Sequence, residues 1–212
     1  ISKRFNLAIL IVAKNEESTI GDIIDKCKPY GEVLIINDNS TDSTLSILKK
    51  KKVNVITNNR QLGYGSSVLK GIKEIISKGF THLIMLDADG EHDPKYIKKF
   101  INKLKDKEVL VLGVREQIQR FSEKVFVFYY RWKFGVSDML CGMRGFDLKI
   151  VEKRYLNLND DLGLNWIIYC LKNNLKFCEL HVSGKKRFNN PRFGNMIWAN
   201  FKILIYLSRN LL

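Results

Sequence analysis

The feature that most constrains the fold is a regular alternation, through the first half of the chain, of apolar β-branched runs with helical patterns. The apolar runs cover 7–13, 33–36, 53–57, 82–86 and 109–113, and they predict strands buried on both faces. Helical patterns cover 19–28, 43–51, 65–78 and 94–105. Alternation of this kind predicts a three-layer α/β/α fold whose central sheet is mostly parallel, with right-handed crossovers.

The second half of the chain is less regular. Its patterns predict a helix at 122–134, a short strand at 143–147, a helix at 161–173 and a strand at 176–182. In the first of these helices, Phe126, Tyr130 and Phe134 fall at helical spacing and are expected to pack inward. No repeat or Pro/Gly linker divides the chain, so we expect one domain over 1–194, followed by an apolar helix over 195–212.

In a parallel sheet, ligands collect at the carboxyl ends of the strands, which directs attention to the segments 14–17, 37–42 and 87–93. The last contains three acidic residues at alternate positions, Asp87, Asp89 and Glu91. Alternate side chains of an extended backbone point the same way, and converging carboxylates suit Mg²⁺ or Mn²⁺. The alternative is a solvated turn in which Asp93 caps the helix that begins at Pro94.

Two other loops contribute candidate ligand contacts. Asp38, in "INDNSTDST", stands at a strand end and could accept hydrogen bonds from a base or a ribose, although the segment also reads as a simple turn. In "NNRQLGYGSSVLKG", Gly63 and Gly65 precede a helix. This loop is neither G-x-G-x-x-G nor a Walker A motif, which argues against a dinucleotide fold and a P-loop enzyme.

Five segments in order, "VAKNEESTI", "INDNSTD", "QLGYGSSVLKG", "LDADGEHDP" and "DMLCGMRGF", resemble the family 2 glycosyltransferases of GT-A fold. The resemblance covers about residues 5 to 150 and is greatest to the branch that contains dolichyl-phosphate mannose synthase and other polyprenyl-phosphate glycosyltransferases. It implies inverting transfer of a sugar from a nucleotide diphosphate sugar, of the GDP-mannose or UDP-glucose type, with Mg²⁺ or Mn²⁺ as cofactor.

The resemblance also implies roles for individual residues. Those implied to bind the nucleotide sugar are Ala13, Asn15, Glu16, Asp38 and Gly63. Asp87 would face the ribose or the metal, Asp89 would bind the metal directly, and Glu91 matches a position where the dolichyl-phosphate branch has a metal-binding Gln. The chain departs from the family pattern at Asn37 and Asn39, where Asp and Gly are usual.

The acceptor determines which further groups are needed. A sugar hydroxyl needs a carboxylate base, whereas a lipid phosphate is already an anion and needs cations around it. After the acidic motif, four arginines lie between 115 and 144, namely Arg115, Arg120, Arg131 and Arg144, and a basic segment, Lys185, Lys186, Arg187 and Arg192, comes after the last strand. Arg144 and Arg187 fall where the related enzymes use basic residues near the phosphates. We therefore expect Asp89, Arg115, Arg120 and Arg144 to be catalytic, and Arg131 and Arg187 to bind substrate.

The alternative within the family is a glycan hydroxyl acceptor with Asp161 as base. Asp160 and Asp161 could equally cap the helix predicted to begin there. A nucleotidyltransferase, which also holds metals with paired carboxylates, is a third reading.

Charge and the end of the chain point to a membrane. A formal net charge of +14 favours an anionic partner, which could be nucleic acid, an acidic membrane surface or a phosphorylated substrate. In 195–212, Asn195, Lys202 and Arg209 fall seven apart on an otherwise apolar helix, a pattern typical of an amphipathic interfacial helix, although packing on the domain or in a homo-oligomer stays open.

We therefore expect a cytoplasmic protein, peripheral on or anchored to the cytoplasmic face of a membrane, with a lipid phosphate acceptor. A nucleic-acid-binding module is disfavoured, because nothing in such a module requires acidic strand ends at Asp38 and Asp87. The four cysteines show no C-x-x-C pairing and indicate reduced thiols.

Overall fold

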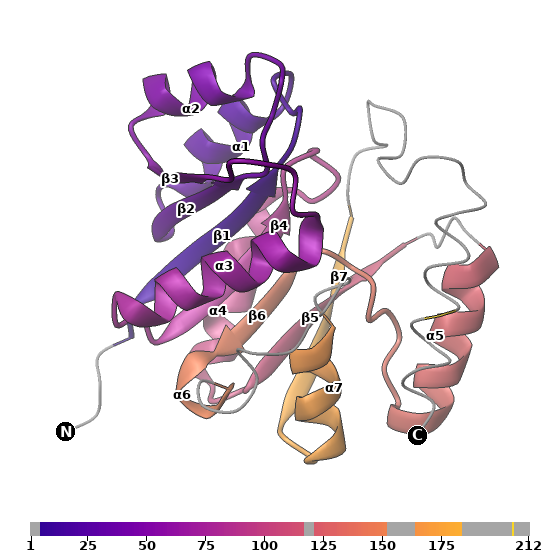
Figure 1. The fold of residues 1–212 in the computed structure, drawn as a ribbon. Coiled ribbons are helices and arrows are strands. Elements are labelled where there is room, and N and C mark those ends of the chain that lie inside the picture. The colour runs from indigo at the N-terminus through magenta and orange to yellow at the C-terminus, as the bar shows by residue number, and fades with distance from the viewer. Residues whose placement is uncertain (1–4, 117–120, 152–163, 184–204, 206–212) are drawn as a thin grey trace.

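The computed structural model describes residues 5–116, 121–151, 164–183 and 205. Its strands form one seven-stranded sheet of order β3-β2-β1-β4-β6-β5-β7 (Figure 1). The strands are β1 (Leu7–Ala13), β2 (Glu32–Asn37), β3 (Asn54–Thr57), β4 (His82–Asp87), β5 (Leu110–Arg115), β6 (Arg144–Asp147) and β7 (Phe177–Val182). All pairs are parallel except those of β6, which runs antiparallel to β4 and β5. The predicted α/β fold with a mostly parallel sheet is confirmed.

Helices lie between the strands at nearly the predicted places. They are α1 (Ile20–Cys27), α2 (Thr44–Lys51), α3 (Tyr64–Ser77), α4 (Ile97–Lys105), α5 (Phe121–Phe134), α6 (Leu148–Val151) and α7 (Asn165–Lys172). The helix predicted from 94 begins with a 3₁₀ turn, η1 (Pro94–Tyr96), capped by the Asp93 carboxylate, which accepts from the Lys95 amide. The predicted helix 195–212 lies outside the described residues, apart from residue 205.

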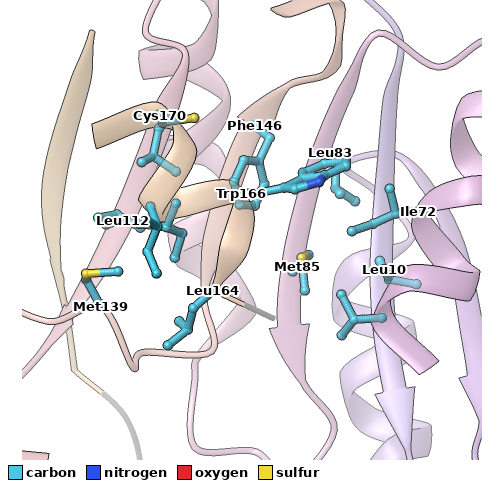
Figure 2. Close-up of a cluster of buried hydrophobic side chains, with 14 of the residues drawn as sticks. Leu10, Ile72, Leu83, Met85, Leu112, Met139, Phe146, Leu164, Trp166 and Cys170 are labelled. Carbon is cyan, nitrogen blue, oxygen red and sulfur yellow. The ribbon is translucent and has the colours of Figure 1, made fainter. Parts of the chain in front are cut away.

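The sheet separates two hydrophobic cores, as a three-layer fold requires. On one face Leu10 of β1 packs with Ile72 of α3, and on the other Ile9 packs with residues of α1 and α4. Figure 2 shows the first core, in which Trp166 of α7 lies between Phe146 and Leu83. The Trp166 ring meets Phe146 of β6 edge-on with ring centroids 5.5 Å apart, so α7 covers the antiparallel strand.

Strand register brings the polar strand ends together. Ala13 of β1 pairs with Asn37 of β2, and Val12 pairs with Asp87 of β4. Asp38 follows directly, and its amide donates to the Ala13 carbonyl at 2.9 Å. The carboxyl ends of β1, β2 and β4 therefore form one edge, where the candidate ligand-binding loops begin.

Gly71 of α3 packs directly against strands β1 and β2. A Cβ at this position would lie 2.4 Å from Leu10 Cδ1 and 3.1 Å from Ile36 Cγ1. Because overpacking a close-packed core costs about 1–3 kcal/mol, Gly71→Ala is expected to lower the free energy of unfolding by that amount in urea titrations. Gly21→Ala is the matched control, since its Cβ would meet nothing closer than 3.4 Å. Equal stabilities of the two variants would refute tight α3 packing.

Candidate active site

Hydrogen bonds join the loops that follow β1 and β2. The Asn15 side chain accepts from the Thr41 amide at 2.8 Å and donates to the Thr41 hydroxyl at 3.2 Å. The Glu16 amide donates to the hydroxyl of Thr44 at 2.7 Å, where α2 begins. Asn15 adopts a φ of 53°, a left-handed conformation that Asn tolerates better than most residues. These contacts fix Ala13, Asn15 and Glu16, the residues implied to line the nucleotide pocket, beside the loop of Asp38.

Asp38 is buried and orients the third loop. Its Oδ1 accepts from the Leu62 amide at 2.8 Å and from Asn58 Nδ2 at 2.9 Å, and its Oδ2 accepts from the Gly63 amide at 2.9 Å. Gly63 has a φ of 87°, which favours glycine, and it caps the N-terminus of α3. The visible role of Asp38 is thus to hold the 58–63 loop, and its contact with a base or ribose stays a prediction.

Asn37, where the family pattern has Asp, is fully buried beside Asp38. Its Oδ1 accepts from the Ser40 amide at 3.2 Å. Its Nδ2 has no hydrogen-bond partner in the structure. A buried donor of this kind is costly unless a ligand satisfies it. The amide therefore offers a donor where a carboxylate could only accept.

The acidic segment is a turn and not an extended strand. Strand β4 ends at Asp87, and Gly90 adopts a φ of 78° in the bend that follows. Asp89 is buried, and its Oδ1 accepts from the Glu91 amide at 2.9 Å. The expectation that alternation would align three carboxylates is wrong beyond Asp87, because the period of two holds only in extended backbone.

The turn nevertheless gathers donor atoms. Asp87, Glu91 and His92 each place one ligand atom within 4.8 Å of the others. Among the described residues, these three form the group of acidic, His or Cys side chains that lie close enough together to share a metal ion. Asp89 does not belong to this group. His92 was missed by sequence reasoning, and its place directly after Glu91 was the available signal.

His92 is buried, with its Nε2 3.8 Å from Asp87 Oδ2 and 3.8 Å from Cys141 Sγ. Burial acts to lower the pKa of His92, but Cys141, Asp87 and Glu91 outweigh it and raise that pKa to about 9. These neighbours thus favour the protonated, positively charged form of His92.

Two neighbours complete the surroundings of Asp87. The Tyr64 side chain, at the start of α3, lies near its carboxylate, and burial together with Asp87 raises the pKa of Tyr64. On another side lies Gly142, where a Cβ would stand 1.9 Å from Asp87 Oδ2. Gly142, the first glycine of "CGMRGF", therefore allows the 136–143 loop to approach the Asp87 carboxylate. The sequence did not predict this contact.

Arg144 holds that loop in place. It is buried, and its Nε and one terminal nitrogen donate to the carbonyls of Cys141 and Met139 at 2.8 and 3.2 Å. Arg144 of β6 pairs with Met85 of β4, two residues before Asp87, so it lies beside the start of the acidic turn. A role of Arg144 toward a phosphate stays a prediction, but its position beside the turn is compatible with one.

The other predicted arginines differ in their surroundings. Arg115 donates to both carboxylate oxygens of Asp138, at 2.8 and 3.1 Å, and to Glu123 at 3.4 Å. Burial opposes its charge, but these two carboxylates raise its pKa further. Arg115 is thus engaged by carboxylates, and its contact with a phosphate stays a prediction. Arg131 is exposed on α5, whereas Arg120, Arg187 and the candidate base Asp161 lie outside the described residues.

Comparison with known families decides the assignment. The model of a family described as "Glycosyl transferase family 2" matches residues 8–154, a span that contains Asp38, the acidic turn and Arg144. The chain belongs to glycosyl transferase family 2. As a family 2 glycosyltransferase it is an enzyme, and the resemblance drawn from its motifs is confirmed.

Two curated relatives are named as acting on lipid phosphates. The UDP-N-acetylglucosamine–dolichyl-phosphate N-acetylglucosaminyltransferase of Methanococcus voltae is 24% identical over 94% of this chain and 93% of its own length. The polyprenol monophosphomannose synthase of Mycolicibacterium smegmatis is 23% identical over 77% of this chain and 68% of its own. The chain therefore has polyprenyl-phosphate sugar transferases among its relatives.

A solved structure supports the fold. Glucosyl-3-phosphoglycerate synthase of Mycobacterium tuberculosis, in complex with Mn²⁺ and UDP-glucose, superimposes with a TM-score of 0.78 at 16% identity, covering 97% of this chain and 79% of that one. This likeness confirms the GT-A architecture. Among the described residues, no helix has both the length and the apolar character needed to cross a bilayer.

Proposed function

We propose that this glycosyltransferase transfers a sugar, with inversion and with the aid of Mg²⁺ or Mn²⁺, from a nucleotide diphosphate sugar to a polyprenyl phosphate. The observation that carries the proposal is the gathering of Asp87, Glu91 and His92 at the sheet edge where the loops of Asn15 and Asp38 meet. The names of the two lipid-phosphate relatives support the acceptor class. A donor of the GDP-mannose or UDP-glucose type is part of the proposal.

The donor atoms fit a hard divalent cation. Ligands about 2.1 Å from one octahedral ion stand about 3–4 Å apart, so atoms already within 4.8 Å need little movement to share it. Asp87 and Glu91 would hold the ion, with Asp89 as a further proposed ligand after release of its contact with the Glu91 amide. When bound, the cation would stabilise the negative charge that develops on the leaving diphosphate.

The residues around the turn would position the donor. Asn37 Nδ2 is a buried donor available to the base, and the Asp38 loop fixes Gly63 at the positive N-terminus of α3. Gly142 lets the 136–143 loop lie directly against the Asp87 carboxylate. Each group is thus preorganised before the substrate arrives, which lowers the cost of reaching the transition state.

A phosphate acceptor removes the need for a protein base. The nucleophile would be a phosphate oxygen that already carries negative charge, and cations would lower its repulsion from the donor diphosphate. Arg144 is the proposed cation nearest the turn, and Arg120, Arg131 and Arg187 are proposed to assist. We place the enzyme on the cytoplasmic face of a membrane, where such an acceptor would present its headgroup.

The test is a turnover assay with UDP- and GDP-sugars, Mg²⁺ or Mn²⁺, and a polyprenyl phosphate. Release of nucleoside diphosphate is expected to require the lipid, and Asp161→Asn is expected to keep the rate within about threefold, since no base is needed. If nucleoside diphosphate is released equally with and without the lipid, and this release falls a hundredfold or more in Asp161→Asn, the acceptor would instead be a hydroxyl group. Release of pyrophosphate would indicate a nucleotidyltransferase.

A further inference from the structure

Helix α5 has two apolar faces. The inner face is the predicted one, and Phe126 and Tyr130 are at most 1% exposed in the core beside the sheet. The outer face carries three aromatic side chains that the core leaves in solvent. Phe121, Phe128 and Trp132 are 77%, 74% and 78% exposed. Large apolar side chains exposed together usually mark an interaction surface.

The three aromatic residues form one row. They are seven and four positions apart, so at about 100° per residue they lie within about 40° of one another around the helix axis. The buried pair Phe126 and Tyr130 lies on the opposite side. Figure 1 places α5 at the outer edge of the molecule, on the side away from β3. We call this row the outer face of α5.

The exposed charged residues of α5 are all positively charged. Lys124 and Arg131 are exposed beside the aromatic row, and Lys133 is exposed further round the helix near its C-terminal end. Glu123 is the sole acidic residue of α5, and it is 6% exposed and paired with Arg115. The outer face therefore combines aromatic side chains with exposed positive charge and no exposed carboxylate from the helix. Aromatic residues beside Lys and Arg are typical of helices that lie in the headgroup region of a bilayer.

We propose that the outer face of α5 docks this enzyme on an anionic bilayer surface. The net charge of +14 complements such a surface. A second copy fits less well, because two outer faces would bring like charges together. Three aromatic side chains of about 150–250 Å² each also fall short of the roughly 800 Å² per partner that a standard interface buries. The inference deepens the proposed function, because a polyprenyl phosphate is a membrane lipid.

The docking face is connected to the acidic turn. Helix α5 ends at Phe134, Gly135 follows with a φ of 71°, and the next seven residues lead to Gly142 against Asp87. The Arg115 guanidinium joins Glu123 of α5 to Asp138 of that loop. An α5 held at the headgroups would thus bring the loop that borders Asp87 toward a membrane-bound acceptor.

The test is cosedimentation of the full chain with vesicles of phosphatidylcholine and phosphatidylglycerol, at about 7:3, that contain no polyprenyl phosphate. Phe128→Ser with Trp132→Ser is expected to weaken vesicle binding at least tenfold. Ile150→Ser, which changes an exposed apolar residue on α6, is the matched control and should bind like the wild type. Binding should also weaken in pure phosphatidylcholine and at high salt.

Turnover assays separate docking from the proposed reaction. The double variant should keep the wild-type rate with a water-soluble short-chain polyprenyl phosphate and lose it with the vesicle-bound lipid. Wild-type vesicle binding without turnover on either acceptor would overturn the proposed function and leave docking intact. Vesicle binding that is absent in the wild type, or unchanged in the double variant, would overturn docking. Docking would also be overturned if the double variant lost dimer formation or single-stranded RNA binding but still bound vesicles like the wild type.

Discussion

Asp87→Asn is expected to lower kcat/KM for nucleoside diphosphate release at least a thousandfold, equivalent to about 4 kcal/mol of transition-state stabilisation. The change keeps the size of the side chain and removes its charge. Asp87 is the member of the ligand group that lies 3.8 Å from His92 and borders Gly142, so its charge acts at the centre of the site. The variant should also bind Mn²⁺ at least tenfold more weakly, measured by electron paramagnetic resonance of the free ion.

Asp93→Asn is the matched control, because Asp93 belongs to the same acidic segment but faces Lys95 and caps η1. Its rate and its Mn²⁺ affinity should stay close to those of the wild type. If Asp87→Asn retained wild-type turnover and wild-type Mn²⁺ affinity, the acidic turn would not be the cation site. A loss of turnover with unchanged Mn²⁺ affinity would place Asp87 against the substrate instead.

The strands of the first half of the chain could be predicted because each is a local apolar run. The periods of 2 and 3.6 are properties of neighbouring residues, and they located β1, β2 and β4 within a residue or two. The antiparallel direction of β6 was not predictable in the same way. It depends on how α5 and its loop return the chain to the sheet, and that return is decided by packing of distant residues.

The site was predictable only where it coincides with strand ends. Asp38 and Asp87 were found because parallel strands end at one edge. Gly142 was recognised as part of a motif, but its contact with Asp87 joins residues 55 positions apart and has no local signature. Hydrogen bonding of Asp38 to the 58–63 loop and the outer face of α5 are likewise consequences of tertiary structure.

Asp138→Asn is expected to reduce the free energy of unfolding by about 3–5 kcal/mol, because removing one partner leaves a buried charge uncompensated. The Asp138 side chain is fully buried, and its carboxylate accepts two bonds from the Arg115 guanidinium. For a chain of this size each kcal/mol lowers Tm by about 2–4 °C, so Tm should fall by roughly 6–20 °C. Urea titration and thermal unfolding followed by circular dichroism measure both quantities.

Two other variants serve as controls for Asp138→Asn. One breaks an exposed ion pair, and the other removes the buried charges together. Asp22→Asn removes the exposed partner of Lys26 and should leave stability unchanged within error. Arg115→Met combined with Asp138→Leu and Glu123→Gln should recover part of the loss, because all three charges of the buried cluster are then removed. Glu123 still faces Arg115 in Asp138→Asn, so a loss no larger than that of Asp22→Asn would mean that Glu123 alone compensates the guanidinium. In that case the 136–143 loop would owe its position beside Asp87 to Arg144 and not to the ion pair.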